Sequence, residues 1–330
     1  MFLLSVAGIG NTVLQSPLIN ALLKREEFEV DILFGDAGMK AVFEYDTRIK
    51  RAFTLPKSKV AQLRFIYELR KNRYDISIAC FPSNRYEYNL LPFLIGARKR
   101  IIHSYRVGRI RALGFLSTEF VPVDESLHDV EQNMGLLQSC GIDPSGEPVN
   151  LSFSLSEENE KYAEDFLRGL DRRRILGIHP TGTRFLPEKD WPRERFKELV
   201  ERVKEKFNVI LFGTAQELDD YTSMPRVFLC DSSLNNAAAL MKRCSIFLSV
   251  DTGLMHVAAA FGVKQVVLWG PTKFSRTRPW TKNATFIGRT DLEILKYPFE
   301  DTKARFHHPN PRSIMEQISV EDVVTTLTKQ

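Results

Sequence analysis

The segment Ser249–Thr272 restricts the fold of this chain more than any other part of the sequence. The apolar run Cys244–Val250 has the length of a buried strand, and Leu254–Phe261 is apolar on nearly every side, as expected of a buried helix. Gly262 can end that helix, and Val263–Trp269 forms a second apolar run before a Gly-Pro-Thr break. The segment therefore predicts a βαβ unit with parallel strands and a right-handed crossover.

The turn at the start of this helix has the composition of an anion site. Asp251 and Thr252 are residue types that cap helix N-termini, and Gly253 allows other atoms to approach the backbone closely. In an open parallel sheet such a turn lies where the carboxyl ends of the strands meet and ligands bind. The N–H groups and the dipole of the helix favour an anion there, most commonly a phosphate. The same turn also fits an ordinary capped helix, and the turn alone does not separate the two interpretations.

A polar loop, His179–Pro192, is the second informative stretch. It follows a predicted strand and precedes a predicted helix, so we expect it at the same sheet edge as the Asp-Thr-Gly turn. Thr181, Gly182 and Thr183 offer hydroxyl and N–H donors, and Lys189 offers one cation. Together these groups predict a diphosphate-binding loop. The alternative is a surface loop with a solvated lysine.

Strands and helices alternate along the chain, which predicts parallel sheets covered by helices. A chain of 330 residues is long for one hydrophobic core, and the polar run Asp143–Pro148 indicates a linker, so we expect one domain over residues 1–150 and another over 151–330. Residues 273–318 are expected to be irregular, and a last helix begins at Ser319 and is free to pack back on the first domain. A Gly-rich turn is expected at residues 8–11 and a capped helix at 126–140. The other predicted strands cover residues 2–7, 29–34, 51–55, 75–80, 175–179, 209–212 and 227–230.

The charge and the composition exclude some partners. The net charge of +5 is small, and the basic cluster Arg98–Arg111 has only Tyr105 as an interleaved aromatic residue, unlike single-strand-binding surfaces. We expect no nucleic acid and favour an anionic small molecule or an anionic membrane surface. The four cysteines are far apart, and His307-His308 lacks further ligands at metal spacing, so we predict neither a metal site nor a disulfide framework. No apolar run approaches the roughly 20 residues of a membrane span, and we expect a cytoplasmic protein.

Two motifs resemble those of a known family. The run D-T-G-L-M-H-x-A-A-A followed by L-W-G-P-T, and the K-x-W-P end of the polar loop, are similar to the signatures of the heptosyltransferases of glycosyltransferase family nine. Those enzymes transfer a sugar from an ADP-sugar to the core of lipopolysaccharide. The resemblance implies a GT-B fold, in which two Rossmann-like parallel-sheet domains face a central cleft, the first holding the acceptor and the second the nucleotide sugar. It also implies inversion at the anomeric carbon, with no cofactor and no essential metal.

The resemblance assigns roles on the nucleotide-sugar side. Lys189 would bind the diphosphate and stabilise the leaving group, which makes it a catalytic residue, and Glu217 would approach the ribose. Glu217 is equally well explained as a first-turn helix carboxylate, and His256 as a hydrogen-bonded core residue. The predicted nucleotide-sugar-binding residues are Thr181, Gly182, Thr183, Lys189, Glu217, Asp251, Thr252, Gly253, His256, Gly270, Pro271 and Thr272.

The predicted acceptor side departs from the family at one position. In the family, the Gly-rich turn of the first domain carries an aspartate that is taken to deprotonate the acceptor hydroxyl, whereas this sequence has Asn11 there. An amide cannot accept a proton at neutral pH, which leaves three alternatives. Another carboxylate acts as the base, stabilisation of the leaving group suffices for the reaction, or the activity is lost. Asp36, after the second predicted strand, is a candidate base on topology alone. The predicted acceptor-binding residues are Gly10, Asn11, Arg98, Lys99 and Arg100.

The sequence thus predicts an inverting glycosyltransferase that moves a sugar such as heptose from an ADP-sugar to a lipopolysaccharide-core or related glycan acceptor. Two alternatives stay open. A nucleotide-sugar epimerase of the same fold would need ionisable groups on both sides of the sugar, and a catalytically degenerate nucleotide-sugar-binding protein has Asn11 as its best argument. The predicted partners are a nucleotide sugar and an anionic glycolipid acceptor, and these are compatible with a peripheral contact at the inner face of the inner membrane.

Overall fold

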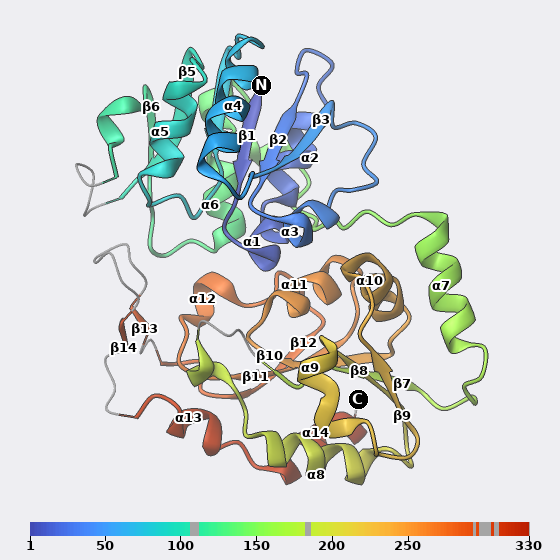
Figure 1. Ribbon diagram of the computed structural model, residues 1–330. Helices are drawn as coiled ribbons and strands as arrows, with labels where there is room; N and C mark the ends of the chain where they lie inside the picture. The colour runs from blue at the N-terminus through green and yellow to red at the C-terminus, as the bar shows by residue number, and fades with distance from the viewer. Residues whose placement is uncertain (106–111, 182–185, 293–294, 297–304, 307–309, 330) are drawn as a thin grey trace. The chain divides into compact units, whose positions relative to one another are not determined.

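The computed structural model describes residues 1–105, 112–181, 186–292, 295–296, 305–306 and 310–329. The chain forms two compact units, one made of Met1–Ser154 with Lys296–Arg305 and the other of Leu155–Leu295 with Phe306–Gln330. Each unit contains a six-stranded parallel sheet whose strands are connected mostly by helices (Figure 1).

The first sheet has the strand order β3-β2-β1-β4-β5-β6. Strands β1 and β2 are buried along their whole length, as expected of a parallel sheet that is covered on both faces. The order reverses between β1 and β4, which creates a switch point at the carboxyl ends of these two neighbours. The strands are β1 Phe2–Ser5, β2 Asp31–Phe34, β3 Arg51–Thr54, β4 Ile76–Ala79, β5 Lys99–Ser104 and β6 Glu119–Pro122.

The helices of the first unit pack on this sheet through apolar side chains. Leu69 of α4 and Tyr88 of α5 join Phe2, Leu4 and Leu33 of the sheet in one buried cluster, while α2 packs against α6. The elements are α1 Ile9–Leu14, α2 Ser16–Leu23, α3 Ala37–Ala41, α4 Lys59–Arg70, α5 Glu87–Leu94 and α6 Asp129–Gly135, with 3₁₀ turns η1 Gly114–Leu116, η2 Gln138–Cys140 and η3 Pro144–Gly146.

The second sheet has the order β12-β11-β10-β7-β8-β9, so its switch point lies between β7 and β10. Close packing requires a glycine at position 177 in β7, because a Cβ there would lie 2.8 Å from Cys244 Sγ and from the ring of Phe247. The strands are β7 Ile175–Ile178, β8 Asn208–Phe212, β9 Val227–Cys230, β10 Ile246–Val250, β11 Gln265–Trp269 and β12 Ala284–Gly288, and a separate pair is formed by β13 Leu295–Lys296 and β14 Arg305–Phe306.

The last helix completes the core of the second unit. Val323 and Leu327 of α14 lie in one buried cluster with Phe196 and Leu199 of α8. The sequence left this helix free to pack on the first domain, but it packs on α8. The elements are α7 Glu157–Leu167, α8 Arg193–Val203, α9 Ala215–Leu218, α10 Leu234–Lys242, α11 Gly253–Ala260, α12 Phe274–Thr277, α13 Ser313–Glu316 and α14 Val320–Lys329, with 3₁₀ turns η4 Pro187–Lys189 and η5 Asp219–Tyr221.

The predicted fold class is confirmed, and each predicted strand overlaps an observed one. Strands β5, β6, β12, β13 and β14 were not predicted. The expectation that residues 273–318 are irregular is wrong where α12, β12, β13, β14 and α13 form. Strands β6 and β12 lie at sheet edges and are only partly buried, so their sequences lack the continuous apolar run that identifies a buried strand. Strand β5 was missed because it begins with the charged residues Lys99-Arg100. The expected helix over residues 126–140 is wrong in its bounds, since α6 spans Asp129–Gly135 and η2 follows. In the described part of the chain, no helix is both long and apolar enough to span a membrane.

Candidate functional site

Buried polar side chains gather at the switch point of the second sheet. The neighbouring strands β7 and β10 end there, and the chain continues into the polar loop after His179 and into the turn at Asp251. Lys189, Asp251, Thr252 and His256 are each at most 9% exposed. Burying polar groups is unfavourable unless they are paired, so their partners decide what this place can bind.

A buried ion pair forms the centre of the site. Lys189 Nζ lies 2.7 Å from Asp251 Oδ2, and the two side chains are 9% and 7% exposed. The hydroxyl of Thr272, after β11, donates to the same carboxylate oxygen at 2.7 Å. Because Lys189 ends η4, one carboxylate ties together the segments that follow β7, β10 and β11. An ammonium group carries three donors, so Lys189 can bond an anion while it keeps Asp251.

Among the residues that the structure describes, no side chain caps the N-terminus of α11. Thr252 occupies the N-cap position, but its hydroxyl bonds no helix N–H and has no hydrogen-bond partner among the described residues. Asp251 bonds Lys189 and Thr272 instead. The prediction of Thr252 as the N-cap residue is confirmed in position, but neither its side chain nor that of Asp251 bonds a helix N–H. An uncapped helix end next to a lysine favours the anion site over the ordinary capped helix.

Further buried polar atoms near the site have no hydrogen-bond partner in the described chain. They include His179 Nδ1, Thr181 Oγ1 and Glu188 Oε2 of the polar loop and His256 Nδ1 in α11. Burial lowers the pKa of His256 to about 4; Asp251 opposes this shift and Lys189 adds to it. The imidazole is therefore neutral near pH 7 and can act as a hydrogen-bonding group but not as a cation. Buried polar atoms without partners indicate that a polar ligand completes the hydrogen bonding here.

Glu217 serves as part of a helix cap. Its Oε2 accepts hydrogen bonds from the N–H and the hydroxyl of Thr214 at 2.8 and 2.9 Å, in a capping box at the start of α9. The first-turn carboxylate that the sequence left open is thus present. Glu217 also acts on His179, because its negative charge opposes the burial that lowers the pKa of this histidine to about 4. Because β8 is the parallel neighbour of β7, the capping box that follows β8 lies at the same sheet edge as the ion pair.

The Gly-Pro-Thr turn after β11 is fixed by packing. Gly270 has no room for a side chain, because a Cβ would overlap Met315 Sδ. Trp269 Nε1 donates to the carbonyl of Thr272 at 3.0 Å, which helps to hold the hydroxyl of Thr272 towards Asp251. Pro271 is buried between them. Gly182 and Thr183, which the sequence also assigned to this site, lie outside the described residues.

Trp191 anchors the end of the polar loop, two residues after Lys189. The indole is 1% exposed, and its Nε1 donates to the carbonyl of Ile318 at 3.0 Å. Its ring packs edge-on against Phe196 of α8, with centroids 4.9 Å apart. The sequence identified the K-x-W-P motif but gave no signal that Ile318 holds its tryptophan.

In the first unit, the side chain of Asn11 bonds the segment just before its own helix. Gly10 and Asn11 lie in α1, which begins at Ile9, so the expected turn at residues 8–11 is wrong in its extent. Asn11 Nδ2 donates to the carbonyl of Ala7 at 2.9 Å. Asp36 follows the neighbouring strand β2, and its Oδ1 accepts from the N–H of Met39 at 2.9 Å as the N-cap of α3. Because β1 and β2 are parallel neighbours, Asn11 and Asp36 share one edge of the first sheet.

A cavity of about 560 Å³ opens at the same edge of the first sheet. Its lining is mostly apolar and comes from the ends of β1 and β2 and from α4 and α5, and its charged members are Asp36, Arg85 and Glu87. This volume lies in the range of small-molecule sites. The sequence did not predict it, because residues far apart in the chain enclose it and form no motif.

The basic residues that were predicted to bind the acceptor lie at the opposite sheet edge. Arg98, Lys99 and Arg100 enter β5 at its amino end, whereas Asn11 and Asp36 follow the carboxyl ends of parallel strands. Arg98 forms an ion pair, and Lys99 and Arg100 donate to backbone carbonyls. The structure therefore does not bring them together with Asn11. Arg106, Arg109, Arg111 and His307-His308, which were considered from the sequence, lie outside the described residues.

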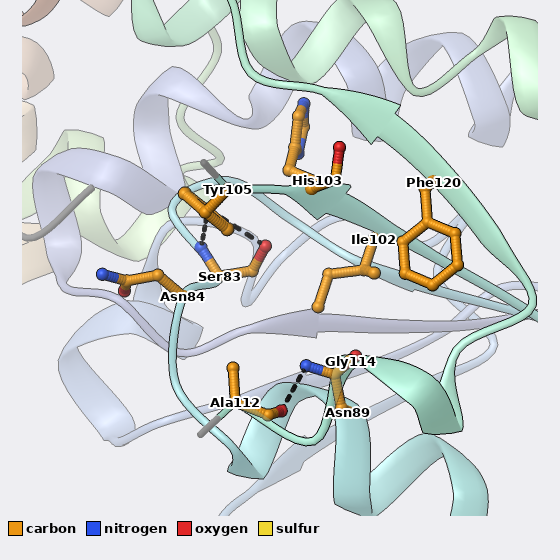
Figure 2. A pocket seen from close by; sticks show the side chains of 10 residues that line it. Ser83, Asn84, Asn89, Ile102, His103, Tyr105, Ala112, Gly114 and Phe120 are labelled. Carbon is orange, nitrogen blue, oxygen red and sulfur yellow. Dashed lines mark hydrogen bonds between the residues drawn. The ribbon is translucent and has the colours of Figure 1, made fainter. Parts of the chain in front are cut away.

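A second, much smaller cavity of about 20 Å³ lies where β4 and β5 end (Figure 2). The N–H of Ser83 donates to Tyr105 Oη at 2.6 Å, and Asn89 Nδ2 donates to the carbonyl of Ala112 at 2.8 Å. A space of this size holds about one water molecule. We interpret it as a packing feature and not as a ligand site.

Comparison with known proteins decides the family. A family model described as glycosyltransferase family 9 (heptosyltransferase) matches residues 62–299. The chain belongs to glycosyltransferase family 9. It is a glycosyltransferase, and its two parallel-sheet units are those of the GT-B fold.

Curated relatives of this family 9 glycosyltransferase match nearly its whole length. It is 24% identical to lipopolysaccharide heptosyltransferase 2 of Escherichia coli (strain K12), with 94% of this chain and 95% of the relative covered. It is also 24% identical to lipooligosaccharide heptosyltransferase 2 of Haemophilus ducreyi, with 93% of each covered. Among solved structures, a family 9 glycosyl transferase from Veillonella parvula has a TM-score of 0.76 at 21% identity, covering 99% of this chain and 95% of the other. The E. coli ADP-heptose lps heptosyltransferase II has a TM-score of 0.75 at 21% identity, covering 100% and 98%.

Proposed function

We propose that this glycosyltransferase transfers a heptose from an ADP-sugar to a lipopolysaccharide-core or related glycan acceptor, with inversion at the anomeric carbon. The names of the relatives support the donor and the acceptor. The structural observation that carries the proposal is the Lys189–Asp251 pair beside the uncapped start of α11, at a switch point of a parallel sheet. A lysine, a helix N-terminus and unpaired hydroxyls suit a diphosphate.

The chemistry on this side is stabilisation of the leaving group. As the bond between the sugar and the diphosphate breaks, negative charge grows on the leaving phosphate. The ammonium of Lys189, the first N–H groups of α11 and the hydroxyl of Thr252 are the donors for that charge. Asp251, with Thr272, holds Lys189 in position and does not itself contact the anion. These charges need no metal ion, so we propose that a chelator leaves the rate unchanged.

On the acceptor side we propose Asp36 as the general base. Asn11 cannot remove a proton from a hydroxyl at neutral pH. Asp36 lines the 560 Å³ cavity, and its cap to α3 uses Oδ1, so Oδ2 is the oxygen that would receive the proton of an acceptor hydroxyl held in the cavity. We place this reaction at the cytoplasmic face of the inner membrane, where a glycolipid acceptor presents its sugars.

The test is a transfer assay with the purified chain, ADP-heptose and a lipopolysaccharide-core acceptor that lacks the added heptose. Mass spectrometry of both substrates distinguishes three outcomes. An extended acceptor supports the proposal, an isomerised ADP-sugar would identify an epimerase, and ADP-sugar binding without any product would identify the degenerate binding protein that Asn11 favours.

The role of Asp36 is tested in the same assay. Asp36→Asn should lower the rate by about 100-fold or more, with ADP affinity unchanged, because it removes the base and keeps a side chain that can cap. Asp143→Asn is the matched control, since Asp143 caps η3 in the same unit and lines no cavity described above. A rate loss below tenfold for Asp36→Asn would refute its role as base.

A further inference from the structure

Helix α4 has apolar side chains on two opposite faces. One face packs into the first unit, where Leu69 is buried and Phe65 and Ile66 pack against the same cluster. On the other face, Val60, Leu63 and Tyr67 are 75%, 68% and 63% exposed. Their spacing of three and four residues places them in one row along the helix. Neighbouring large apolar side chains that are exposed to this degree require an explanation.

Cations border this apolar row. Between residues 57 and 73 the chain has six basic residues and one acidic residue, Glu68. The helical period places Arg64 and Lys71 on one side of the row. It places Lys59 and Arg70 on the other side. All six basic residues are exposed, and they are Lys57, Lys59, Arg64, Arg70, Lys71 and Arg73.

Most of this charge is not neutralised by the protein itself. Lys71 pairs with Glu68 at 2.7 Å and lies over the ring of Tyr67, 4.5 Å from its centroid. Within the residues that the structure describes, Lys59 and Arg64 form no ion pair. The face defined by Val60, Leu63 and Tyr67 therefore combines an apolar row with uncompensated positive charge on both sides.

We propose that this face of α4 docks onto an anionic phospholipid bilayer. A helix that lies in the plane of a bilayer surface needs an apolar row that enters the acyl boundary and cations beside it that meet the lipid phosphates. Tyr67 suits the boundary, since its ring is apolar and its hydroxyl stays in water. Cations lie on both sides of the apolar row, so two copies of this face would repel each other. The charge therefore favours a flat anionic surface over a second copy of this chain as the occupant. The other face of α4 lines the cavity proposed for the acceptor, but Val60, Leu63 and Tyr67 do not. Vesicle binding is measured without sugar substrates, so its outcome is independent of the proposed function.

The experiment is co-sedimentation of the full chain with vesicles. One set contains phosphatidylglycerol and phosphatidylcholine in equal amounts, and the other contains phosphatidylcholine alone. We expect binding to the anionic vesicles, a decline with added salt, and a loss of about tenfold or more for the variant Leu63→Glu/Tyr67→Glu, which places charge in the row. Arg64→Ala should weaken binding by about fivefold, the effect of one cation at an anionic surface.

Phe115→Glu is the matched control, because Phe115 is 67% exposed on η1 and lies outside α4. All changed side chains are exposed, so thermal unfolding should show each variant folded, and it is measured on the same samples. Equal binding to the two kinds of vesicle, or equal losses for the α4 and Phe115 variants, would overturn the proposal. So would concentration-dependent dimers of the wild type that Leu63→Glu/Tyr67→Glu abolishes, since the occupant would then be a second copy.

Discussion

Replacing Lys189 by alanine tests whether the buried ion pair serves folding, phosphate binding or both. The change leaves the carboxylate of Asp251, which is 7% exposed, bonded to Thr272 but without a cation. Removing one member of a buried ion pair lowers the free energy of unfolding by about 3–5 kcal/mol. Asp251→Asn in the same chain removes the unpaired charge, so the double variant should regain most of that stability.

Phosphate affinity should not return with the stability. A hydrogen bond from a charged group contributes about 1.5–3 kcal/mol, so loss of Lys189 should weaken ADP binding by roughly 10- to 150-fold in Kd. AMP lacks the second phosphate and should lose less.

Urea denaturation and titration calorimetry with ADP and AMP measure the two effects separately. Lys197→Ala is the matched control, because Lys197 on α8 pairs with Asp220 at the surface of the same unit and should change neither quantity by more than about 1 kcal/mol. A double variant as unstable as Lys189→Ala would show that the unpaired carboxylate is not the cause. Equal losses for ADP and AMP would show that Lys189 does not contact the second phosphate.

Three other changes test the remaining parts of the site. Gly253→Val should weaken ADP binding in calorimetry, because a side chain at the start of α11 obstructs the phosphate; unchanged affinity in the folded variant would remove the phosphate from this turn. Asn11→Ala should lower the rate of single-turnover transfer by less than about 100-fold, since an amide can orient the acceptor hydroxyl but cannot deprotonate it. Asn11→Asp should preserve or raise the rate. A loss beyond about a thousandfold in Asn11→Ala, with ADP binding intact, would contradict this role of Asn11. Burial lowers the pKa of His256 from about 6.5 in the unfolded chain to about 4 in the folded chain. Between these pH values the unfolded state binds the extra proton, so the free energy of unfolding should fall as pH drops from about 6.5 towards 4, by up to about 3 kcal/mol. Urea denaturation across this range should give a flatter profile for His256→Gln, and identical profiles would count against the assignment.

The sequence predicted the βαβ unit around Asp251 in the second unit because local patterns encode it. An apolar strand, a Gly-containing turn and an apolar helix are consecutive in the chain, and the parallel sheet then determines at which edge the turn lies. The pairing of Lys189 with Asp251 could not be predicted, because it depends on the path of the polar loop. The missing cap at Thr252 could not be predicted either, since the hydroxyl of a threonine in that position normally accepts a hydrogen bond from a helix N–H.

The arrangement of the first unit was predicted less well for a different reason. The charge of Arg98, Lys99 and Arg100 suggested that they bind an anionic acceptor. The charge of a residue does not indicate whether it lies at the amino or the carboxyl end of a strand. The unrecognised strand β5 places them at the amino end, away from Asn11. The cavity near Asp36 is formed by apolar residues of two helices and two strands, and no linear pattern identifies such a set.

The contact between Trp191 and Ile318 joins residues that are 127 positions apart. Protein synthesis proceeds from the N-terminus, so the loop that carries Lys189 emerges from the ribosome long before the segment that holds its tryptophan. Met315, which packs under Gly270, belongs to the same late segment. The first unit has nearly all of its sheet and helices by residue 154 and can fold during translation. The surroundings of Lys189 and Asp251, in contrast, can be completed only after residues 313–318 have been synthesised, and a nascent chain that is stopped before residue 313 would present the signature motifs without these contacts.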